Sequence, residues 1–140
     1  MKRSAEIESQ AFAFRLDEHS GVPVYRQLMD QVQAAIASGA VTPGSQLPTV
    51  RQVAVDLAIN PNTVSRAYRE MEIRGLLDTQ QGTGTFIADR KVEYSKDERD
   101  RLLAQLAGEF VSRAGAAGFT LKQLIKTLRE MHPEEDPKRK

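Results

Sequence analysis

The sequence predicts a mostly α-helical fold with one small β-hairpin. Apolar residues recur every three or four positions in five separate stretches, which is the period of a helix with one buried face. Between residues 76 and 88 this period gives way to two short β-favouring runs around a glycine-containing turn. The chain has 140 residues, which suits one domain or a small domain with an appendage.

The composition excludes several classes of protein. No run approaches the ~18 apolar residues of a membrane span, and no apolar run follows the basic start as in a secretory signal. We therefore expect a cytoplasmic protein that does not bind membranes. Cysteine is absent, and the two histidines, His19 and His132, lack ligand-like spacing, so we expect no metal site and no cofactor.

Bulk charge gives no sign of a nucleic-acid partner. The net charge is +1; residues 1–90 contain 9 basic and 10 acidic side chains, and residues 91–140 contain 11 and 9. Nucleic-acid-binding domains usually have a basic surface. A DNA interface in this chain must therefore depend on where individual charges lie.

The first twenty residues are predicted to form an N-terminal arm. Its alternating Phe12, Phe14 and Leu16 would also suit a short strand. A helix follows Pro23 and ends at Gly39, because proline is tolerated in a first turn and glycine favours a helix end. Residues 42–48, rich in proline and glycine, are expected to form a connecting loop.

Two shorter helices follow. Thr49 and an amide three positions later form a capping-box pattern for a two-turn helix. After a turn at residues 58–60, Asn60 is placed to cap the next helix with Pro61 in its first position, and Gly75 ends it. The apolar stripe of this helix is Val64, Ala67, Tyr68 and Met71.

Two helices with apolar stripes are expected in residues 91–133. Ser95 and Thr120 begin capping boxes, and the glycines of residues 115–118 separate the helices near Ala114. The charged tail, residues 134–140, is predicted to be disordered.

Two helices joined by a three-residue turn, the second opening with short polar side chains, indicate a helix-turn-helix. The second helix of this motif lies in the major groove with its N-terminal residues at the base edges. Asn pairs with adenine, Arg with guanine, and Ser or Thr reaches bases or phosphates. The contacts predicted from this helix are Asn62, Thr63, Ser65, Arg66 and Arg69. The alternatives are a solvated helix face and, for Arg66, a pair with Glu70 or a phosphate contact.

The preceding helix and the hairpin add candidate contacts. Thr49 and Arg51 lie in the first turn of a helix that crosses the DNA backbone in this motif. The hairpin tip is a candidate wing, against a minor groove or phosphates, through Gln81, Gly82 and Thr83. A nucleotide-binding loop is excluded because it needs a third glycine and a following helix. An ion-paired surface arginine and a plain hairpin turn remain the alternatives.

These motifs, in order and spacing, resemble the GntR family of bacterial winged-helix transcription regulators over about residues 22–88. They are Leu47-Pro-Thr-Val-Arg51, Asn60-Pro-Asn-Thr-Val64, Arg66-Ala-Tyr-Arg-Glu-Met-Glu72, Gly75-Leu76 and Gly82-Thr-Gly-Thr-Phe86. The resemblance implies DNA contacts by Arg51, Asn62, Thr63, Ser65, Gln81 and Gly82. Many relatives have Arg at the positions of Pro61 and Ser65, so their base preference does not transfer to this chain.

The C-terminal region indicates which subfamily the chain resembles. Many members of the family have a much larger ligand-binding or aminotransferase-like domain, whereas residues 91–140 contain only two amphipathic helices. This is similar to the YtrA subfamily, whose short helical C-terminus serves dimerisation. The helices bury little alone, so they pack on the first domain or on a second copy. The predicted dimer contacts are Leu103, Leu106, Phe110, Leu121, Leu124 and Leu128.

The sequence therefore predicts a sequence-specific regulator that binds a palindromic double-stranded DNA operator as a homodimer, and the resemblance favours a repressor. The expected divisions are an arm (1–20), a winged helix-turn-helix domain (21–90), a dimerisation region (91–133) and a tail (134–140). No nucleophile and base set supports an enzyme. The alternative is a winged-helix protein-interaction module. The sequence identifies no small-molecule effector.

Overall fold

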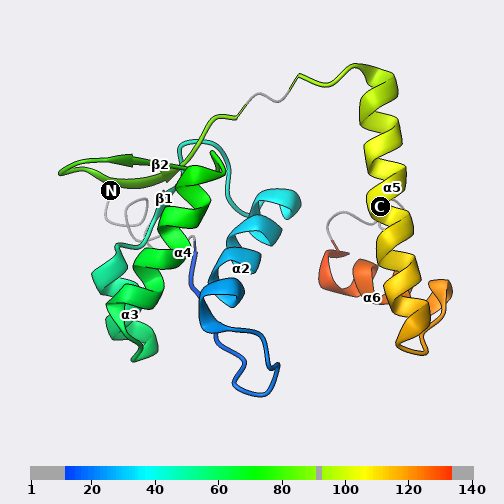
Figure 1. Cartoon of the computed structure of the whole chain (residues 1–140), viewed down its shortest axis with the longest axis horizontal. Coiled ribbons are helices and arrows are strands. Elements are labelled where there is room, and N and C mark those ends of the chain that lie inside the picture. The colour runs from blue at the N-terminus through cyan, green and yellow to red at the C-terminus, as the bar shows by residue number, and fades with distance from the viewer. Residues whose placement is uncertain (1–11, 91–92, 134–140) are drawn as a thin grey trace. The chain divides into compact units, whose positions relative to one another are not determined.

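The computed structural model describes residues 12–90 and 93–133, in two compact units that divide after Lys91 (Figure 1). In the first unit, helices α2 (Val24–Ser38), α3 (Val50–Leu57) and α4 (Pro61–Ile73) accompany strands β1 (Gln46–Leu47), β2 (Leu77–Gln80) and β3 (Gly84–Ile87). The second unit contains α5 (Lys96–Ala116) and α6 (Leu121–Met131). The predicted fold class, mostly helical with a small hairpin, is confirmed.

The hairpin forms part of a three-stranded antiparallel sheet in the order β1-β3-β2. Leu77 pairs with Ile87 and Gln80 with Gly84 in the hairpin, while Gln46 of β1 pairs with Phe86. The expectation of a plain loop over residues 42–48 is therefore wrong at β1. A two-residue strand has no periodicity of its own, and β1 is defined only by its pairing with β3.

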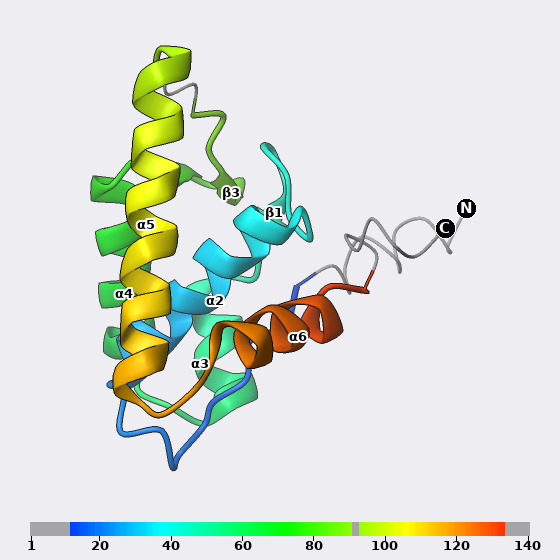
Figure 2. The same cartoon turned by 90° about the vertical axis from the view of Figure 1, so that its right-hand side faces the viewer.

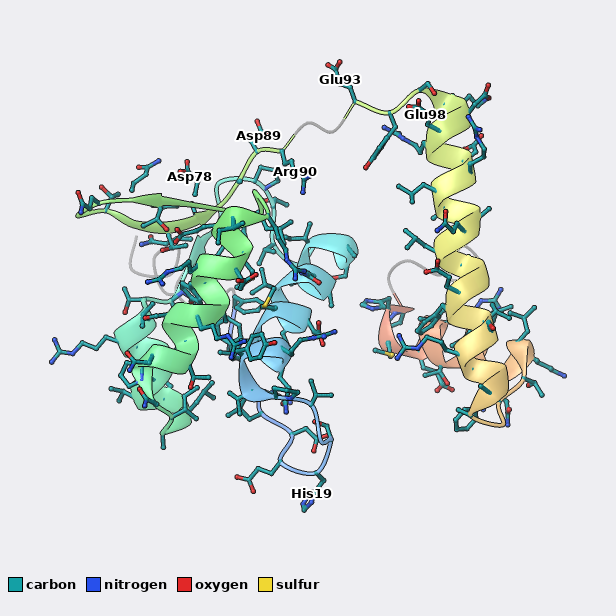
Figure 3. The ribbon with its side chains drawn as sticks, viewed as in Figure 1. His19, Asp78, Asp89, Arg90, Glu93 and Glu98 are labelled. Carbon is teal, nitrogen blue, oxygen red and sulfur yellow. The ribbon has the colours of Figure 1, made fainter. Side chains whose placement is uncertain are left out.

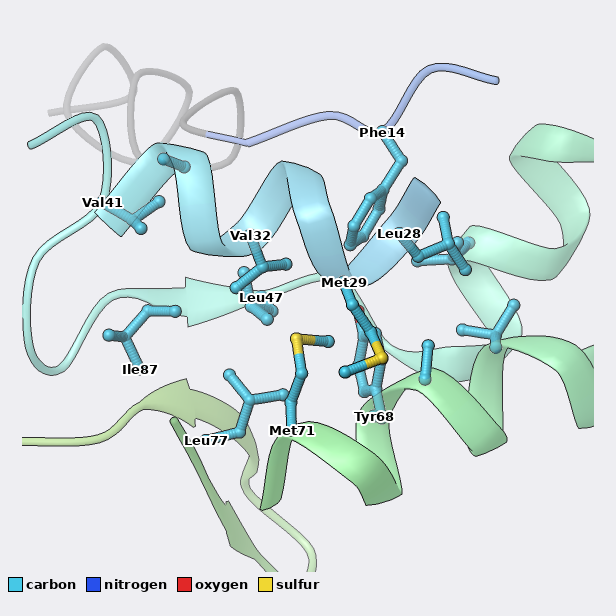
Figure 4. Close-up of a cluster of buried hydrophobic side chains, with 14 of the residues drawn as sticks. Phe14, Leu28, Met29, Val32, Val41, Leu47, Tyr68, Met71, Leu77 and Ile87 are labelled. Carbon is cyan, nitrogen blue, oxygen red and sulfur yellow. The ribbon is translucent and has the colours of Figure 1, made fainter. Parts of the chain in front are cut away.

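The core of the first unit lies between the three helices and the sheet (Figure 4). Leu28 and Val32 of α2 belong to it with Val64 and Met71 of α4, and all four are fully buried. The predicted stripe of α4 is confirmed, since its four residues are all buried. The remaining buried apolar residues are Phe14, Met29, Ala35, Val41, Leu47, Val53, Ala54, Ala67, Tyr68, Leu77 and Ile87.

Helix ends lie close to the predicted positions because their signals are local. Gly39 ends α2 with a φ of 77°, in the left-handed region that favours glycine. After α4, the Gly75 and Leu76 amides donate to the Glu72 and Met71 carbonyls, each at 2.9 Å, in a Schellman motif. Only half of the capping box expected at Thr49 forms in the described structure: Thr49 accepts from the Gln52 amide.

The described part of the N-terminal arm is extended but forms no strand over residues 12–17. The Gln31 side chain accepts from the Arg15 amide at 2.8 Å and donates to the Arg15 carbonyl at 2.6 Å. Gln27 accepts from the Asp17 amide at 2.9 Å. These bonds hold the segment along α2 and bring Phe14 into the core. Residues 1–11 lie outside the described part of the chain.

In the second unit, the capping boxes expected at Ser95 and Thr120 are both present. Helix α5 continues to Ala116, two residues past the expected end, and the chain turns at Gly118, whose φ is 92°. Helix α6 then points away from the C-terminal end of α5 (Figure 2). The predicted tail, residues 134–140, lies outside the described residues. No helix within the described ranges is long and apolar enough to cross a membrane.

Candidate nucleic-acid interface

The turn between α3 and α4 is a tight backbone reversal. Ala58 adopts a left-handed φ of 54°, and its amide donates to the Val55 carbonyl at 3.3 Å. The Ile59 amide donates to the Ala54 carbonyl at 3.0 Å. The three residues between the helices therefore redirect the chain from α3 into α4, as a helix-turn-helix requires.

Asn60 fixes the start of α4. Its side chain accepts from the Asn62 amide at 2.9 Å, and Pro61 occupies the first turn, so the predicted cap is confirmed. Asn62 is exposed and Thr63 is half-buried at this end of the helix. A helix N-terminus carries a partial positive charge, which favours phosphate. The first turn of α4 thus offers a partial positive charge to the phosphate backbone of DNA. It also offers amide and hydroxyl groups to base edges.

Further along α4 the five predicted contacts separate into different environments. Ser65 is half-buried, whereas Arg69 is exposed. The guanidinium of Arg66 lies over the ring of Tyr25, with Cζ 3.9 Å from the ring centre. The Arg66 guanidinium, from the second turn of α4, is therefore held against α2 in this structure. The alternative pair with Glu70 is not formed among the described residues, and contact of Arg66 with a base or a phosphate stays a prediction.

Thr49 and Arg51 are both exposed at the start of α3. The Thr49 hydroxyl accepts from the Gln52 amide at 3.1 Å and so belongs to the helix cap. Tyr68 of α4 donates a hydrogen bond to the carbonyl of Pro48, immediately before this cap. The start of α3 is thereby fixed to the middle of α4, which places the Arg51 and Asn62 side chains on one rigid frame.

The wing tip, Gln81–Thr83, is exposed. Gly82 has a φ of 80°, and the Thr83 amide donates to the Gln80 carbonyl at 3.0 Å, closing the turn. Gln46 of β1 donates to the Thr83 carbonyl at 3.3 Å. The wing tip is therefore supported from the sheet edge opposite β2.

The other strand of the wing is tied to α4. The Thr79 hydroxyl donates to the Glu72 carboxylate and lies 3.3 Å from the Thr85 hydroxyl. Asp78 precedes Thr79 in β2, on the alternate face of the strand, and is exposed (Figure 3). A side-chain hydrogen bond thus connects the wing to α4, a link that the sequence did not reveal.

The arginines of this surface are not neutralised by neighbouring acids. The ion pair found in the described structure is Lys126–Glu130, at 3.8 Å in α6, so Arg51 and Arg69 have no ion-pair partner within those residues. Phosphate groups could therefore pair with them without displacing a carboxylate. The loop with His19 lies apart from α3 and the wing (Figure 3), and no described group of acidic or histidine residues is arranged to hold a metal.

Sequence reasoning missed four residues that build this surface: Tyr25, Gln46, Tyr68 as a hydrogen-bond donor, and Glu72. Each acts on a partner that is distant along the chain, or in another element, so local patterns gave no signal. Tyr68 was correctly placed in the core by its spacing. Its hydroxyl was the one available sign, because a buried tyrosine normally finds an acceptor.

Comparisons with known proteins agree with this geometry. The model of a family described as bacterial regulatory proteins, gntR family, matches residues 24–87. The HTH-type transcriptional regulator Rv1152 of Mycobacterium tuberculosis is 39% identical over 114 residues, which are 81% of this chain and 89% of that protein. The HTH-type transcriptional repressor YtrA of Bacillus subtilis is 31% identical over 117 residues, 84% of this chain and 90% of that protein.

A solved structure extends the likeness beyond the first unit. A transcriptional antiterminator from Listeria monocytogenes EGD-e aligns with a TM-score of 0.63 and 26% identity. The alignment covers 86% of this chain and 90% of that one. The similarity therefore includes helices of the second unit as well as the helix-turn-helix and its wing.

Proposed function

Because the chain belongs to the GntR family of bacterial regulatory proteins and is YtrA-like, it is a DNA-binding transcriptional regulator, and we propose that it represses transcription as a homodimer on a palindromic operator. The observation that carries this proposal is the first turn of α4, where Asn62 is exposed and Thr63 half-buried, together with the exposed Arg51 of α3 and the exposed wing tip. Repression is proposed because the B. subtilis relative is named a repressor. Such a regulator acts in the cytoplasm, where its DNA is.

In the proposed complex, each DNA-contact residue has a role set by its position. Asn62 and Thr63 contact base edges in the major groove, and Ser65 lies beside them. Arg51 and Thr49 contact the phosphate backbone from the start of α3. Further along α4, Arg66 contacts a base or a phosphate, and Arg69 adds a phosphate contact. Gln81, Gly82 and Thr83 bring the wing to the flanking minor groove or backbone.

The second unit supports a dimer because its apolar side chains are not covered within it. No residue of α5 or α6 is buried. Of the predicted contacts, Leu103 is 65% exposed and Phe110 is 50% exposed, while Leu124 is half-buried. Leu106, Leu121 and Leu128 are likewise exposed. Water contact with this much apolar surface is unfavourable, and a second copy of the same helices would remove it.

A symmetric dimer reads a symmetric site. Most homodimers have a two-fold axis, and the two recognition helices then contact half-sites related by the same axis. The operator is therefore expected to be an inverted repeat.

The test is selection of duplexes from a random pool by the full-length protein. We expect enrichment of an inverted repeat, with affinity that falls as salt rises because phosphate contacts release counterions. A pool that stays random would contradict the proposal and favour the protein-interaction module. An enriched site with no internal symmetry would contradict the homodimer.

A further inference from the structure

A cavity of about 650 Å³ opens between the N-terminal segment and α3. Phe12 and Phe14 form one wall, the chain from Gln46 to Thr49 forms another, and α3 closes it with Gln52, Val53, Asp56 and Leu57. Small-molecule sites typically occupy about 300–1,000 Å³ and have mostly apolar walls with a few polar groups. This cavity has that size and that mixture of side chains.

The apolar wall is shaped by two aromatic rings. The Phe12 and Phe14 rings lie edge to face, with centroids 4.7 Å apart and planes at 85°. Phe14 is 8% exposed and also contacts the Tyr68 ring. Leu47, Val53 and Leu57 complete the wall. A flat ring is the ligand group that such a surface accepts best.

Hydrogen bonds within the chain hold the aromatic wall in place. Gln31 makes two hydrogen bonds to the backbone of Arg15, and Gln27 bonds to Asp17, one and three residues beyond Phe14. A site whose wall is already in place loses less conformational entropy on binding.

The polar side of the cavity contains one charge. Gln46, Thr49 and Gln52 offer neutral groups, and Asp56 offers a carboxylate that has no ion-pair partner in residues 12–90 or 93–133. A carboxylate that lines the same cavity as aromatic rings favours a cation, since both the charge and the ring faces attract it. The favoured ligand is therefore a ring with an ammonium group.

We propose that this cavity binds a small aromatic amine, with its ring against Phe12 and Phe14 and its ammonium group at Asp56. The ligand would also act as an effector, because Thr49 belongs both to the cavity wall and to the predicted DNA-contact set. Gln46, another wall residue, supports the wing tip through Thr83. The effector role rests on the proposed function, whereas the binding site does not.

The binding test uses the full-length, ¹⁵N-labelled protein and three probes with one ring: tryptamine, indole-3-ethanol and indole-3-acetate. We expect saturable amide shifts in residues 12–14 and 46–57 with millimolar tryptamine, weaker binding of the neutral alcohol and the weakest binding of the anion. Equal binding of tryptamine and indole-3-acetate, shifts outside these residues, or no shift with any probe would overturn the site.

Two matched variants distinguish the effect of the Asp56 charge from a general effect of removing a carboxylate. Asp56→Asn should weaken tryptamine binding by up to about fivefold, the value of an exposed ion pair, and leave indole-3-ethanol unaffected. Asp78→Asn removes an exposed carboxylate from β2 and should change the binding of neither tryptamine nor indole-3-ethanol. Loss of tryptamine binding by the same factor in both variants would overturn the role of Asp56.

The effector test adds a selected operator duplex to the tryptamine titration. Because ligand and DNA would share Thr49, DNA should weaken tryptamine binding, and tryptamine should weaken DNA binding by the same factor. Tryptamine binding that DNA leaves unchanged would overturn the effector role alone. Failure to select any duplex would instead overturn the proposed function, while the shifts with tryptamine would still establish the site.

Discussion

Tyr68 connects the two helices of the helix-turn-helix through its ring and its hydroxyl. The residue is 3% exposed in the core, and the hydroxyl donates to the Pro48 carbonyl. Burial raises the pKa of the Tyr68 phenol well above its usual range, because the anion would lose its hydration. One side chain therefore contributes packing and a tether between α4 and the start of α3.

Tyr68→Phe keeps the ring and removes the tether. We expect a loss of about 0.5–1.5 kcal/mol in the free energy of unfolding, the net value of one hydrogen bond. Urea unfolding at neutral pH measures it. Tyr94→Phe, at an exposed tyrosine outside the first unit's core, is the control and should change little. Equal unfolding midpoints for Tyr68→Phe and the wild type would contradict the assigned role of the hydroxyl.

The raised pKa of Tyr68 also predicts a loss of stability in alkali. Above about pH 10 the unfolded chain releases the phenol proton while the folded chain retains it. The free energy of unfolding should therefore fall with rising pH, by at most about 1.4 kcal/mol per unit from this group. Because Tyr68→Phe cannot titrate, its alkaline slope should be shallower than that of the wild type. Parallel curves in thermal melts from pH 9 to about 12 would exclude this contribution.

Residues at the DNA surface should separate into two kinds by their effect on sequence preference. Asn62→Ala and Thr63→Ala should each cost roughly 1–3 kcal/mol on the preferred duplex, about ten- to a hundredfold, and less on random DNA. Arg51→Ala should weaken both duplexes alike and reduce the salt slope by about one. Titrations at several salt concentrations measure this. Arg99→Ala, in α5, is the charge control.

The assignment fails if Arg51→Ala changes base preference while both α4 variants bind as the wild type does. Gly82→Ala belongs with Arg51, because its φ of 80° strains any other residue and displaces the wing. It should weaken all duplexes similarly. A change confined to the preferred duplex would instead place the wing at base edges.

At the scale of elements, predictions succeeded where the signal lies within a few residues. The caps at Asn60, Ser95 and Thr120 depend on side chains two or three positions from the groups they satisfy. Strand β1 could not be predicted in this way, since its partner Phe86 is forty residues from Gln46. The hydrogen bonds of Gln31 to the N-terminal segment could not be predicted either, because glutamine has no characteristic position in such a contact.

The stack of Arg66 on Tyr25 is another non-local contact, and it joins α4 to α2. Spacing placed Arg66 on the same face as Asn62, but it could not show that an aromatic ring from α2 would hold the guanidinium. The DNA contacts of α4 stay predictions, and what the structure adds is the contact that orients Arg66. The sequence did not predict the contacts that orient these residues.

The energy of this stack can be measured by a double-mutant cycle. Tyr25→Leu and Arg66→Gln each remove one partner, and the double variant removes both. We expect a coupling of about 0.5–1 kcal/mol in the free energy of unfolding, as for an exposed cation–π pair. Arg69→Gln combined with Tyr25→Leu is the matched control, with no coupling expected. A coupling near zero for Arg66 would contradict the energetic role assigned to the stack.

At the scale of the whole molecule, the two units differ in what they bury. The first unit encloses a core of fifteen apolar residues, whereas the second leaves its phenylalanines and all its leucines but the half-buried Leu124 exposed. Covering the apolar surface of the second unit therefore lowers the free energy of the protein. The homodimer proposed above does this with a copy of the same helices and places two DNA-binding units on one operator.

A single charge in the apolar stripe should therefore separate the dimer. Leu106→Glu introduces a carboxylate at a position 53% exposed in one chain but buried in the proposed interface. An unpaired charge is costly to bury, so light scattering should show a dimer for the wild type and a monomer for the variant at micromolar concentration. Ser112→Glu, on the opposite side of α5, adds the same charge and should stay dimeric. Operator affinity should fall with dimer loss, because one chain contacts only a half-site. A monomeric wild type would overturn the dimer itself, and a dimeric Leu106→Glu would place its interface elsewhere.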